Sequence, residues 1–283
     1  MKIAFSPCPN DTFVFHALVH GLIPGAPEFE VTYADIDITN NWAIDRTGPE
    51  ILKISYAALP WVLEDYALLP CGGALGRGCG PLVLTQGSST EKLDPSALSG
   101  RRVAVPSERS TAYLLFRLWA ARNVPGGVGE IVVMPFDKIM PAVRDGQIDA
   151  GLVIHEARFT YPNYGLAMMT DLGSWWEATT GLPIPLGAII ARRSLDLKRI
   201  AGWIQDSVRY AWDHPEVSRS YIASHAQEMA PEVTQAHIDL YVNEFTGELG
   251  EEGYNAVSAL LTLAADEGLV PRINPSQLIW KPE

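Results

Sequence analysis

The sequence predicts an α/β protein with two lobes and a ligand-binding cleft between them. Short apolar runs alternate with amphipathic stretches, a pattern typical of strands and helices in layered, largely parallel sheets. The alternation forms two successive series, and the second, roughly residues 87–186, lies between the apolar runs GPLVLTQG and IPLGAIIARR. These runs would carry the chain into a second lobe and back, as in a hinged fold whose ligand lies at the carboxyl ends of the strands.

Length and composition support this division. A chain of 283 residues fits two lobes at roughly 150 residues per domain, and 47% hydrophobic residues supply enough core material. We therefore assign residues 1–86 and 187–283 to the first lobe and residues 87–186 to the second.

In the first lobe, KIAF predicts a strand, and DTFVFHALVHG predicts a helix that Asn10 or Asp11 caps and Gly21 ends. FEVTYADIDI alternates apolar and polar residues and predicts a second strand. EILKISYAAL predicts a strand that turns into a helix near Ser55, and residues 195–268 predict mostly helices.

The sequence of the second lobe shows the same alternation of predicted strands and helices. RRVAVP, EIVVMPF and IDAGLVIHE read as strands, and DKIMPAVRDGQ reads as a helix that ends at Gly146. SERSTAYLLFRLWAAR reads as a loop followed by a helix.

Charge and cysteine content limit the partners. A net charge of -12 argues against nucleic acid, and no apolar run approaches the ~18 residues of a membrane helix. Cys8, Cys71 and Cys79 form no CxxC pair, which indicates a reducing compartment. MKIAFSPCPND reaches prolines and Asp11 before any signal-peptide core could form. We therefore expect a cytoplasmic protein whose partner is a small molecule.

Several motifs indicate structural rather than catalytic or ligand-binding roles. Gly76, Gly78 and Gly80 of GRGCGP precede a strand, whereas a dinucleotide fingerprint follows one, so they indicate a turn or close backbone packing. His16 and His20 lie four apart but lack a third ligand, and no metal site is predicted. We expect Cys8 to be a small packing residue and to find His214, His225 and His237 on the surface.

The stretch PSERSTAY is the first candidate site. Ser107, Ser110 and Thr111 stand between a strand and a helix start, where free amides and hydroxyls suit a carboxylate or phosphate. The alternative is N-capping, for which one hydroxyl suffices. In LKISY, Lys53 and Ser55 end a strand at what should be the same edge as the cleft.

The second candidate is His155, which ends the buried run of residues 150–154. Ligands of α/β sheets lie at such strand ends, although a histidine there can also be satisfied by its neighbours. Glu156 would orient the ring or face solvent.

Six segments together resemble the 1,4-dihydroxy-6-naphthoate synthases, the MqnD family of the futalosine route to menaquinone. They are SPCPNDTFVFHALVHG, LKISYAALP, GRGCGPLVL, STAYLLFRLW, FDKIMPAVRDGQIDAGLVIHEARFTY and GLPIPLGAIIARR. They keep the family order over nearly the whole chain; SPCPNDT and GLVIHE are the most specific, and the helices after Leu195 resemble the family only loosely.

The resemblance implies a two-lobed periplasmic-binding-protein-like (type 2) fold in a cytoplasmic enzyme. Such an enzyme splits the carboxylated substrate cyclic dehypoxanthine futalosine into 1,4-dihydroxy-6-naphthoate and a three-carbon fragment, without a metal or organic cofactor. It implies His155 as the catalytic base. The substrate-binding positions that match the family are Lys53, Ile54, Ser55, Ser110 and Thr111, and the further residues expected to line the cleft are Asn10, Asp11, Ser107 and Glu156.

Two alternatives remain at the level of sequence. One is a non-catalytic solute-binding protein of the same fold, which would need an export signal. The other is chorismate dehydratase of the same pathway, whose family lacks SPCPNDT and GLVIHE. Turnover assays with cyclic dehypoxanthine futalosine and with chorismate would separate these alternatives from the synthase.

Overall fold

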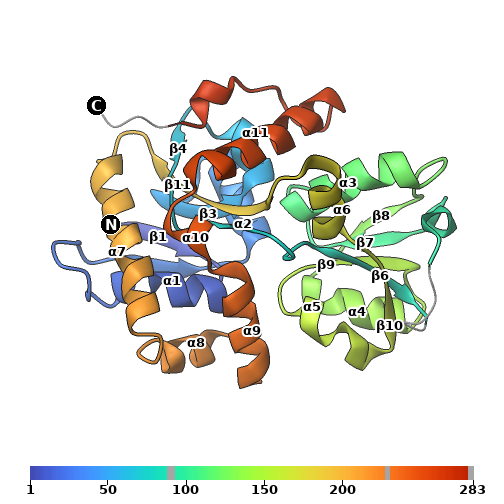
Figure 1. Ribbon diagram of the computed structural model, residues 1–283, viewed down its shortest axis with the longest axis horizontal. Coiled ribbons are helices and arrows are strands. Elements are labelled where there is room, and N and C mark those ends of the chain that lie inside the picture. Colours follow the sequence, from blue (N-terminus) through green and yellow to red (C-terminus); the bar gives the residue numbers. More distant parts are fainter. Residues whose placement is uncertain (88–92, 227–229, 280–283) are drawn as a thin grey trace. The chain divides into compact units, whose positions relative to one another are not determined.

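The computed structural model describes residues 1–87, 93–226 and 230–279, which form two compact units (Figure 1). Unit 1 consists of Met1–Gly76 and Pro185–Glu283, and unit 2 is Arg77–Ile184. Each unit contains one mixed sheet, so the predicted α/β class is confirmed. The first segment of unit 1 ends at Gly76 rather than at residue 86, because the strand at residues 82–86 pairs within the sheet of unit 2.

The sheet of unit 1 has the order β2-β1-β3-β11-β4, with β5 also paired to β11. Its strands are β1 (Lys2–Phe5), β2 (Glu30–Tyr33), β3 (Ile51–Ser55), β4 (Tyr66–Leu68), β5 (Ala74–Gly76) and β11 (Ile184–Arg192). β1 is parallel to β2 and β3, whereas β11 is antiparallel to β3 and β4. The strand that returns from unit 2 therefore occupies the middle of this sheet.

Helices cover this sheet and supply most of its core. They are α1 (Pro9–Val19), α2 (Ile36–Ile44), η1 (Tyr56–Trp61), α7 (Leu197–Asp213), α8 (Arg219–His225), α9 (Pro231–Tyr241), α10 (Glu244–Gly247), α11 (Gly250–Asp266) and η4 (Pro275–Gln277). Phe5 of β1, Phe15 of α1 and Ile204 of α7 belong to one buried cluster. Because α7, α8 and α9 all contact α1, this helix is buried on nearly every side.

The sheet of unit 2 has the order β10-β6-β9-β7-β8. Its elements are β6 (Leu82–Gln86), η2 (Pro95–Leu98), β7 (Val103–Val105), α3 (Thr111–Asn123), β8 (Ile131–Val133), α4 (Phe136–Arg144), β9 (Ala150–Val153), α5 (Ala157–Thr160), η3 (Tyr161–Tyr164), β10 (Leu166–Asp171) and α6 (Leu172–Thr180). β7 is parallel to β8 and β9, and β6 is antiparallel to β9 and β10.

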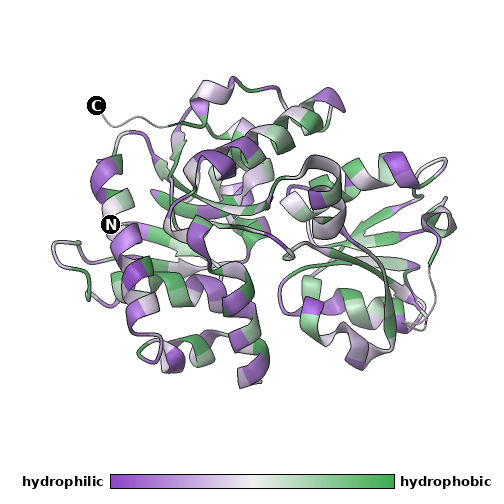
Figure 2. Ribbon diagram, viewed as in Figure 1, coloured by the Kyte–Doolittle hydropathy of each residue, from purple (hydrophilic) through white to green (hydrophobic). Residues whose placement is uncertain are grey.

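Close packing of α4 fixes β9 in this sheet. Ile139 and Val143 of α4 lie in the core of unit 2, and a Cβ on Gly151 of β9 would come within 2.4 Å of Ile139. Only glycine admits the helix at this distance. Figure 2 shows the strands of both sheets as predominantly hydrophobic.

Two sequence-based expectations about the first lobe differ from the structure. α1 begins at Pro9 after Cys8, so Asn10 and Asp11 lie in its first turn rather than at its cap. FEVTYADIDI is not one strand, because β2 ends at Tyr33 and α2 begins at Ile36. Separately, no helix in the described part of the chain combines the length and apolarity that a bilayer crossing requires.

Candidate functional site

A buried ion pair stands at the carboxyl end of β3 in unit 1. Side chains alternate along a strand, so Lys53 shares the face of Ile51, which packs in the core with α1. On that face the Lys53 ammonium pairs with the Asp11 carboxylate in the first turn of α1. The two side chains are only 5% and 3% exposed, so each charge depends on the other for its stabilisation.

Further hydrogen bonds fix the orientation of the Asp11 carboxylate. Ser6 Oγ donates to Asp11 Oδ2 at 2.8 Å, and Asn10 Nδ2 donates to Asp11 Oδ1 at 2.8 Å. The Asn10 amide oxygen therefore faces the other way, 3.1 Å from His237 Nε2. Because that oxygen can only accept, His237 Nε2 carries the proton in this contact.

Ser55 and Asn40 form a second pair at the same strand end. The Ser55 amide donates to Asn40 Oδ1 at 2.7 Å, and Asn40 Nδ2 donates to Ser55 Oγ at 3.0 Å. Asn40 lies on α2 and is fully buried. Ile54, between Lys53 and Ser55, is buried and lies opposite Ala188 of β11, so its side chain contributes packing.

In unit 2, the serines between β7 and α3 are already engaged by the backbone. Ser110 Oγ accepts from the Tyr113 amide at 3.1 Å and donates to the Ser107 carbonyl at 2.9 Å. Ser107 Oγ accepts from the Arg109 amide at 3.1 Å. The capping interpretation is therefore confirmed for Ser110, while Thr111 occupies the first position of α3 and is buried.

His155 lies just beyond β9 in an unusual backbone conformation. Its φ of 57° is in the left-handed region, which costs a residue with a Cβ roughly 1–2 kcal/mol. The imidazole is half-buried, and its centroid lies 5.3 Å from that of Phe136 at the start of α4. Strain of this kind persists where the surrounding structure holds it, and it is common at functional sites.

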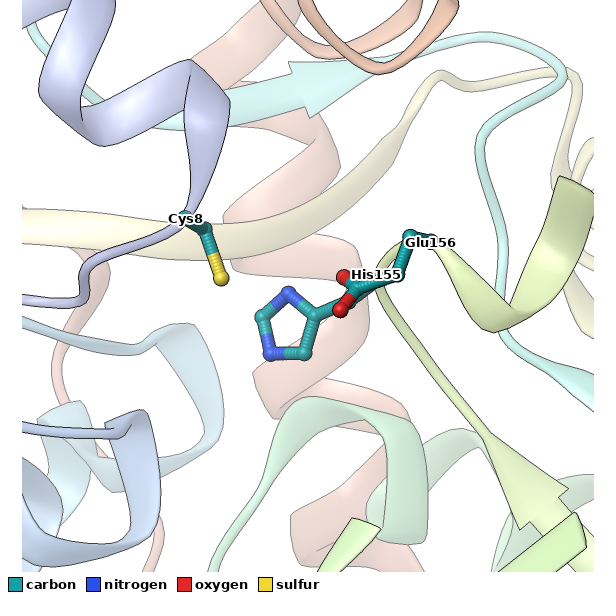
Figure 3. Close-up of side chains that lie close together, drawn as sticks. All are labelled: Cys8, His155 and Glu156. Atoms are coloured by element: carbon teal, nitrogen blue, oxygen red, sulfur yellow. The ribbon is translucent and has the colours of Figure 1, made fainter. Parts of the chain in front are cut away.

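Glu156 follows His155 in the same turn (Figure 3). Its Oε2 is buried and has no hydrogen-bond partner among the residues that the structure describes. A buried carboxylate oxygen without a donor is costly, so it can accept a hydrogen bond from a ligand at this strand end.

Strand topology brings the candidates of unit 2 to one edge. β7 and β9 are parallel neighbours, so their carboxyl ends meet at the same side of the sheet. The turn 107–111 follows one strand and the turn 155–156 follows the other. The predicted residues thus form two groups, one at the strand ends of each unit.

The sequence missed three members of the unit 1 group. Ser6 directly follows the first predicted strand, which was a usable signal. Asn40 lies in α2, whose first residues, 36–38, had been predicted to belong to a strand. The prediction that His237 lies on the surface is wrong, since the residue is only 1% exposed and its side chain contacts that of Asn10. His214 is exposed as predicted, and His225 is partly buried.

The remaining motifs are structural, as the sequence suggested. Gly78 has a φ of 67°, and a Cβ on Gly80 would come within 2.0 Å of the Gly173 amide nitrogen. The three cysteines are free and buried, and burial raises the pKa of the Cys71 and Cys79 thiols to about 12. Thiols with so high a pKa are poor nucleophiles at neutral pH.

His16 and His20 belong to an aromatic cluster on α1. Their ring centroids lie 4.4 Å apart, and Tyr221 of α8 packs against both. His20 is at the C-cap, and its Nδ1 contacts the His16 carbonyl at 2.8 Å, as expected for a helix end. These contacts give the pair a packing role between α1 and α8.

Comparison with known proteins gives two full-length relatives. The profile of a family described as menaquinone biosynthesis matches residues 1–266. A protein of Streptomyces coelicolor named 1,4-dihydroxy-6-naphtoate synthase is 67% identical over 283 residues, which cover 99% of this chain and 98% of the relative. A protein of Thermus thermophilus with the same name is 46% identical over 272 residues, 95% of each chain.

Solved structures show the same architecture. A crystal structure of a protein from Archaeoglobus fulgidus matches with a TM-score of 0.86 and 32% identity, covering 95% of this chain and 98% of the other. The periplasmic aliphatic sulphonate binding protein of Escherichia coli matches with a TM-score of 0.70 at 15% identity, covering 100% and 92%. The periplasmic-binding-protein-like fold is thereby confirmed.

Proposed function

Because this chain belongs to the menaquinone biosynthesis family, we propose that it is a carbon–carbon lyase that forms 1,4-dihydroxy-6-naphthoate. The proposed substrate is cyclic dehypoxanthine futalosine, which would be split into the naphthoate and a three-carbon fragment. The observation that carries this proposal is 67% identity, over nearly the full length of both chains, to a relative named for this product.

His155 is the proposed general base. Removal of one proton from the sugar-derived ring would let a carbon–carbon bond break while the nascent aromatic system takes the electrons. A histidine imidazole can accept a proton near neutral pH, because its ordinary pKa is about 6.5. The strand-end position of His155, its left-handed backbone and the Phe136 ring beside it support this role, since together they hold the imidazole in one place.

The substrate carboxylate is assigned to the start of α3. The Lys53 charge is neutralised by Asp11, which leaves it a poor partner for a second carboxylate. The start of α3, with Thr111 at its first position, has no paired carboxylate of this kind. Its backbone amides and the helix dipole favour an anion there. Lys53 and Ser55 would then bind polar substituents of the substrate. Asp11, oriented by Asn10, would hold Lys53, and Asn40 would hold Ser55.

The proposed setting is the cytoplasm, with a small carboxylated molecule as the partner. The net charge of -12 gives neither nucleic acid nor an anionic membrane surface an electrostatic attraction to this chain. The local helix start therefore has to provide the attraction for the anionic substrate.

Incubation of the purified protein with cyclic dehypoxanthine futalosine, and separately with chorismate, tests the proposal. We expect the naphthoate to form from the first substrate and no reaction with the second. Turnover of chorismate would identify a chorismate dehydratase. Binding of the first substrate without product would identify a non-catalytic binding protein.

A further inference from the structure

The turn that carries His155 is unusual among the described residues. Apart from glycines, only His155 and Arg46 have a positive φ in the part of the chain that the structure describes. A strained turn keeps its geometry only if neighbouring elements hold it.

Backbone hydrogen bonds join the turn to α5. The His155 carbonyl accepts from the Arg158 amide at 3.3 Å, and the Glu156 carbonyl accepts from the Phe159 amide at 2.9 Å. The turn is thus continuous with α5. Its position in unit 2 depends on what holds this short helix.

The Arg158 side chain anchors α5 at two points. Nη1 donates to the Gly80 carbonyl at 2.8 Å, just before β6, and Nη2 donates to Asp171 Oδ2 at 2.6 Å, at the end of β10. The Arg158 and Asp171 side chains are only 19% and 10% exposed. A planar guanidinium that bonds two fixed acceptors defines an orientation, which a single ammonium does not.

Both anchor points are themselves rigid. Asp171 Oδ1 accepts from the amides of Gly173 at 2.8 Å and Ser174 at 3.2 Å, so it also caps α6. Gly80 and Gly173 pack backbone to backbone, since a Cβ on either would come within 3 Å of the other's main chain. The guanidinium therefore joins α5 to a junction that can move little.

We propose that Arg158 is a positioning residue for the His155 imidazole. It acts through α5 by holding the strained turn against the Gly80–Asp171 junction, and it makes no contact with the substrate. The inference rests on the proposed function insofar as His155 is the base. The geometric claim, that Arg158 fixes the His155 side chain, can be measured without turnover.

Three arginine variants test this role. Arg158→Met keeps the length but removes the charge and all donors, and Arg158→Lys keeps the charge without the two-pronged geometry. Arg144→Met is the matched control, because Arg144 forms an exposed ion pair with Asp145 elsewhere in unit 2. We expect Arg158→Met to lower kcat by about 10- to 100-fold with KM within about threefold, since misplacing a base affects the chemical step most.

Arg158→Lys should recover part of this loss, and Arg144→Met should match the parent enzyme. A loss of melting temperature in Arg158→Met with an unchanged kcat of the folded enzyme would show a merely structural role and overturn the proposal. If Arg158→Met does not fold, Arg158→Lys and Asp171→Asn decide, because the asparagine keeps an oxygen to cap α6 and removes the charge.

NMR of the histidine side chains tests the proposal without any substrate. With the His155 signal assigned from His155→Asn, Arg158→Lys should shift or broaden that signal while the other histidines keep theirs. An unchanged His155 signal would overturn the proposal. If the parent enzyme has no turnover, the proposed function fails, and this measurement still decides the role of Arg158.

Discussion

The backbone of His155 limits which substitutions can test its chemistry. At a φ of 57°, alanine would lose the imidazole and remain in a strained conformation, so two effects would be mixed. Asparagine tolerates the left-handed region better than most residues with a Cβ. It also keeps a polar group of similar size while removing a usable proton acceptor.

We therefore expect His155→Asn to fold normally and to lose turnover by roughly 10² to 10⁴, the usual contribution of a positioned base. Substrate affinity should change much less, because the lost interaction matters mainly in the transition state. The measurements are kcat and a binding titration of this one variant. Turnover at the parent rate would remove His155 from the mechanism, and an equal loss of affinity would make it a binding residue.

The Lys53–Asp11 pair should matter for folding as well as for the site. Lys53→Met leaves the Asp11 carboxylate buried without its cation, which should lower the free energy of unfolding by about 3–5 kcal/mol. Lys2→Met is the control, because Lys2 and Glu30 are 59% and 69% exposed and should contribute under about 1 kcal/mol. Chemical denaturation of both variants measures the difference. Equal effects would contradict a buried pair.

At the scale of elements, the junction of Gly80 with Gly173 determines how β6 meets α6. Gly80→Ala would place a Cβ 2.0 Å from a backbone nitrogen, so it should lower the free energy of unfolding by about 3 kcal/mol or more. Gly78→Ala meets no atom within 4 Å and should cost only about 1 kcal/mol, from its left-handed φ. Thermal unfolding compares the two. A smaller effect at Gly80 than at Gly78 would show that the junction can yield.

The contact between α1 and α8 should make stability depend on pH. Burial, together with the charge of His20, lowers the pKa of His16 below its ordinary value. The unfolded chain then binds more protons than the folded one as pH falls below about 6.5, so this group's stabilisation is lost with acidification. His20, Tyr221 and, beyond it, His225 face this position.

We expect the urea midpoint to fall between about pH 7.5 and about pH 5.5, and to fall less in His16→Gln, whose side chain does not titrate. The comparison of the two proteins isolates this one group from the other histidines. An identical fall in both would show that His16 does not report on this contact.

Which elements the sequence revealed depends on how far local pattern matched tertiary context. The strand–turn–helix units around Ser55, Ser110 and His155 were readable because a buried run ended in polar residues. Residues 35–38 alternate like a strand, yet the burial of Thr39, Asn40 and Ala43 favours a helix that local alternation could not show. The burial of His237 depends on a partner 227 residues away in sequence, which no short pattern contains.

At the scale of the whole molecule, the two sheets share one topology. In each sheet, the first strand after the chain passes from one unit to the other is antiparallel to its neighbours. This strand is β6 in unit 2, between β10 and β9, and β11 in unit 1, between β3 and β4. Unit 2 is made from one continuous segment, whereas unit 1 needs both ends of the chain. The two units therefore differ in what each requires to fold.

Residues 77–184 expressed alone should fold, because all strands of their sheet are present in the segment. The expected result is a cooperative thermal transition by circular dichroism and a dispersed amide NMR spectrum. Residues 1–76 alone should show neither, since they lack β11 between β3 and β4. A disordered 77–184 segment would show that unit 2 depends on unit 1.

The place of β11 also sets an order of assembly while the chain is being synthesised. β1 to β5 leave the ribosome first, but the strand that joins β3 to β4 is made only after all of unit 2. Unit 2 has its full set of strands once β10 has emerged, so it can complete its sheet first. Until β11 is made, the edge of β3 that β11 pairs with in the folded protein has no strand partner. Unpaired strand edges are prone to pair with other chains, so the growing chain is open to mispairing at β3 until its last strand is added.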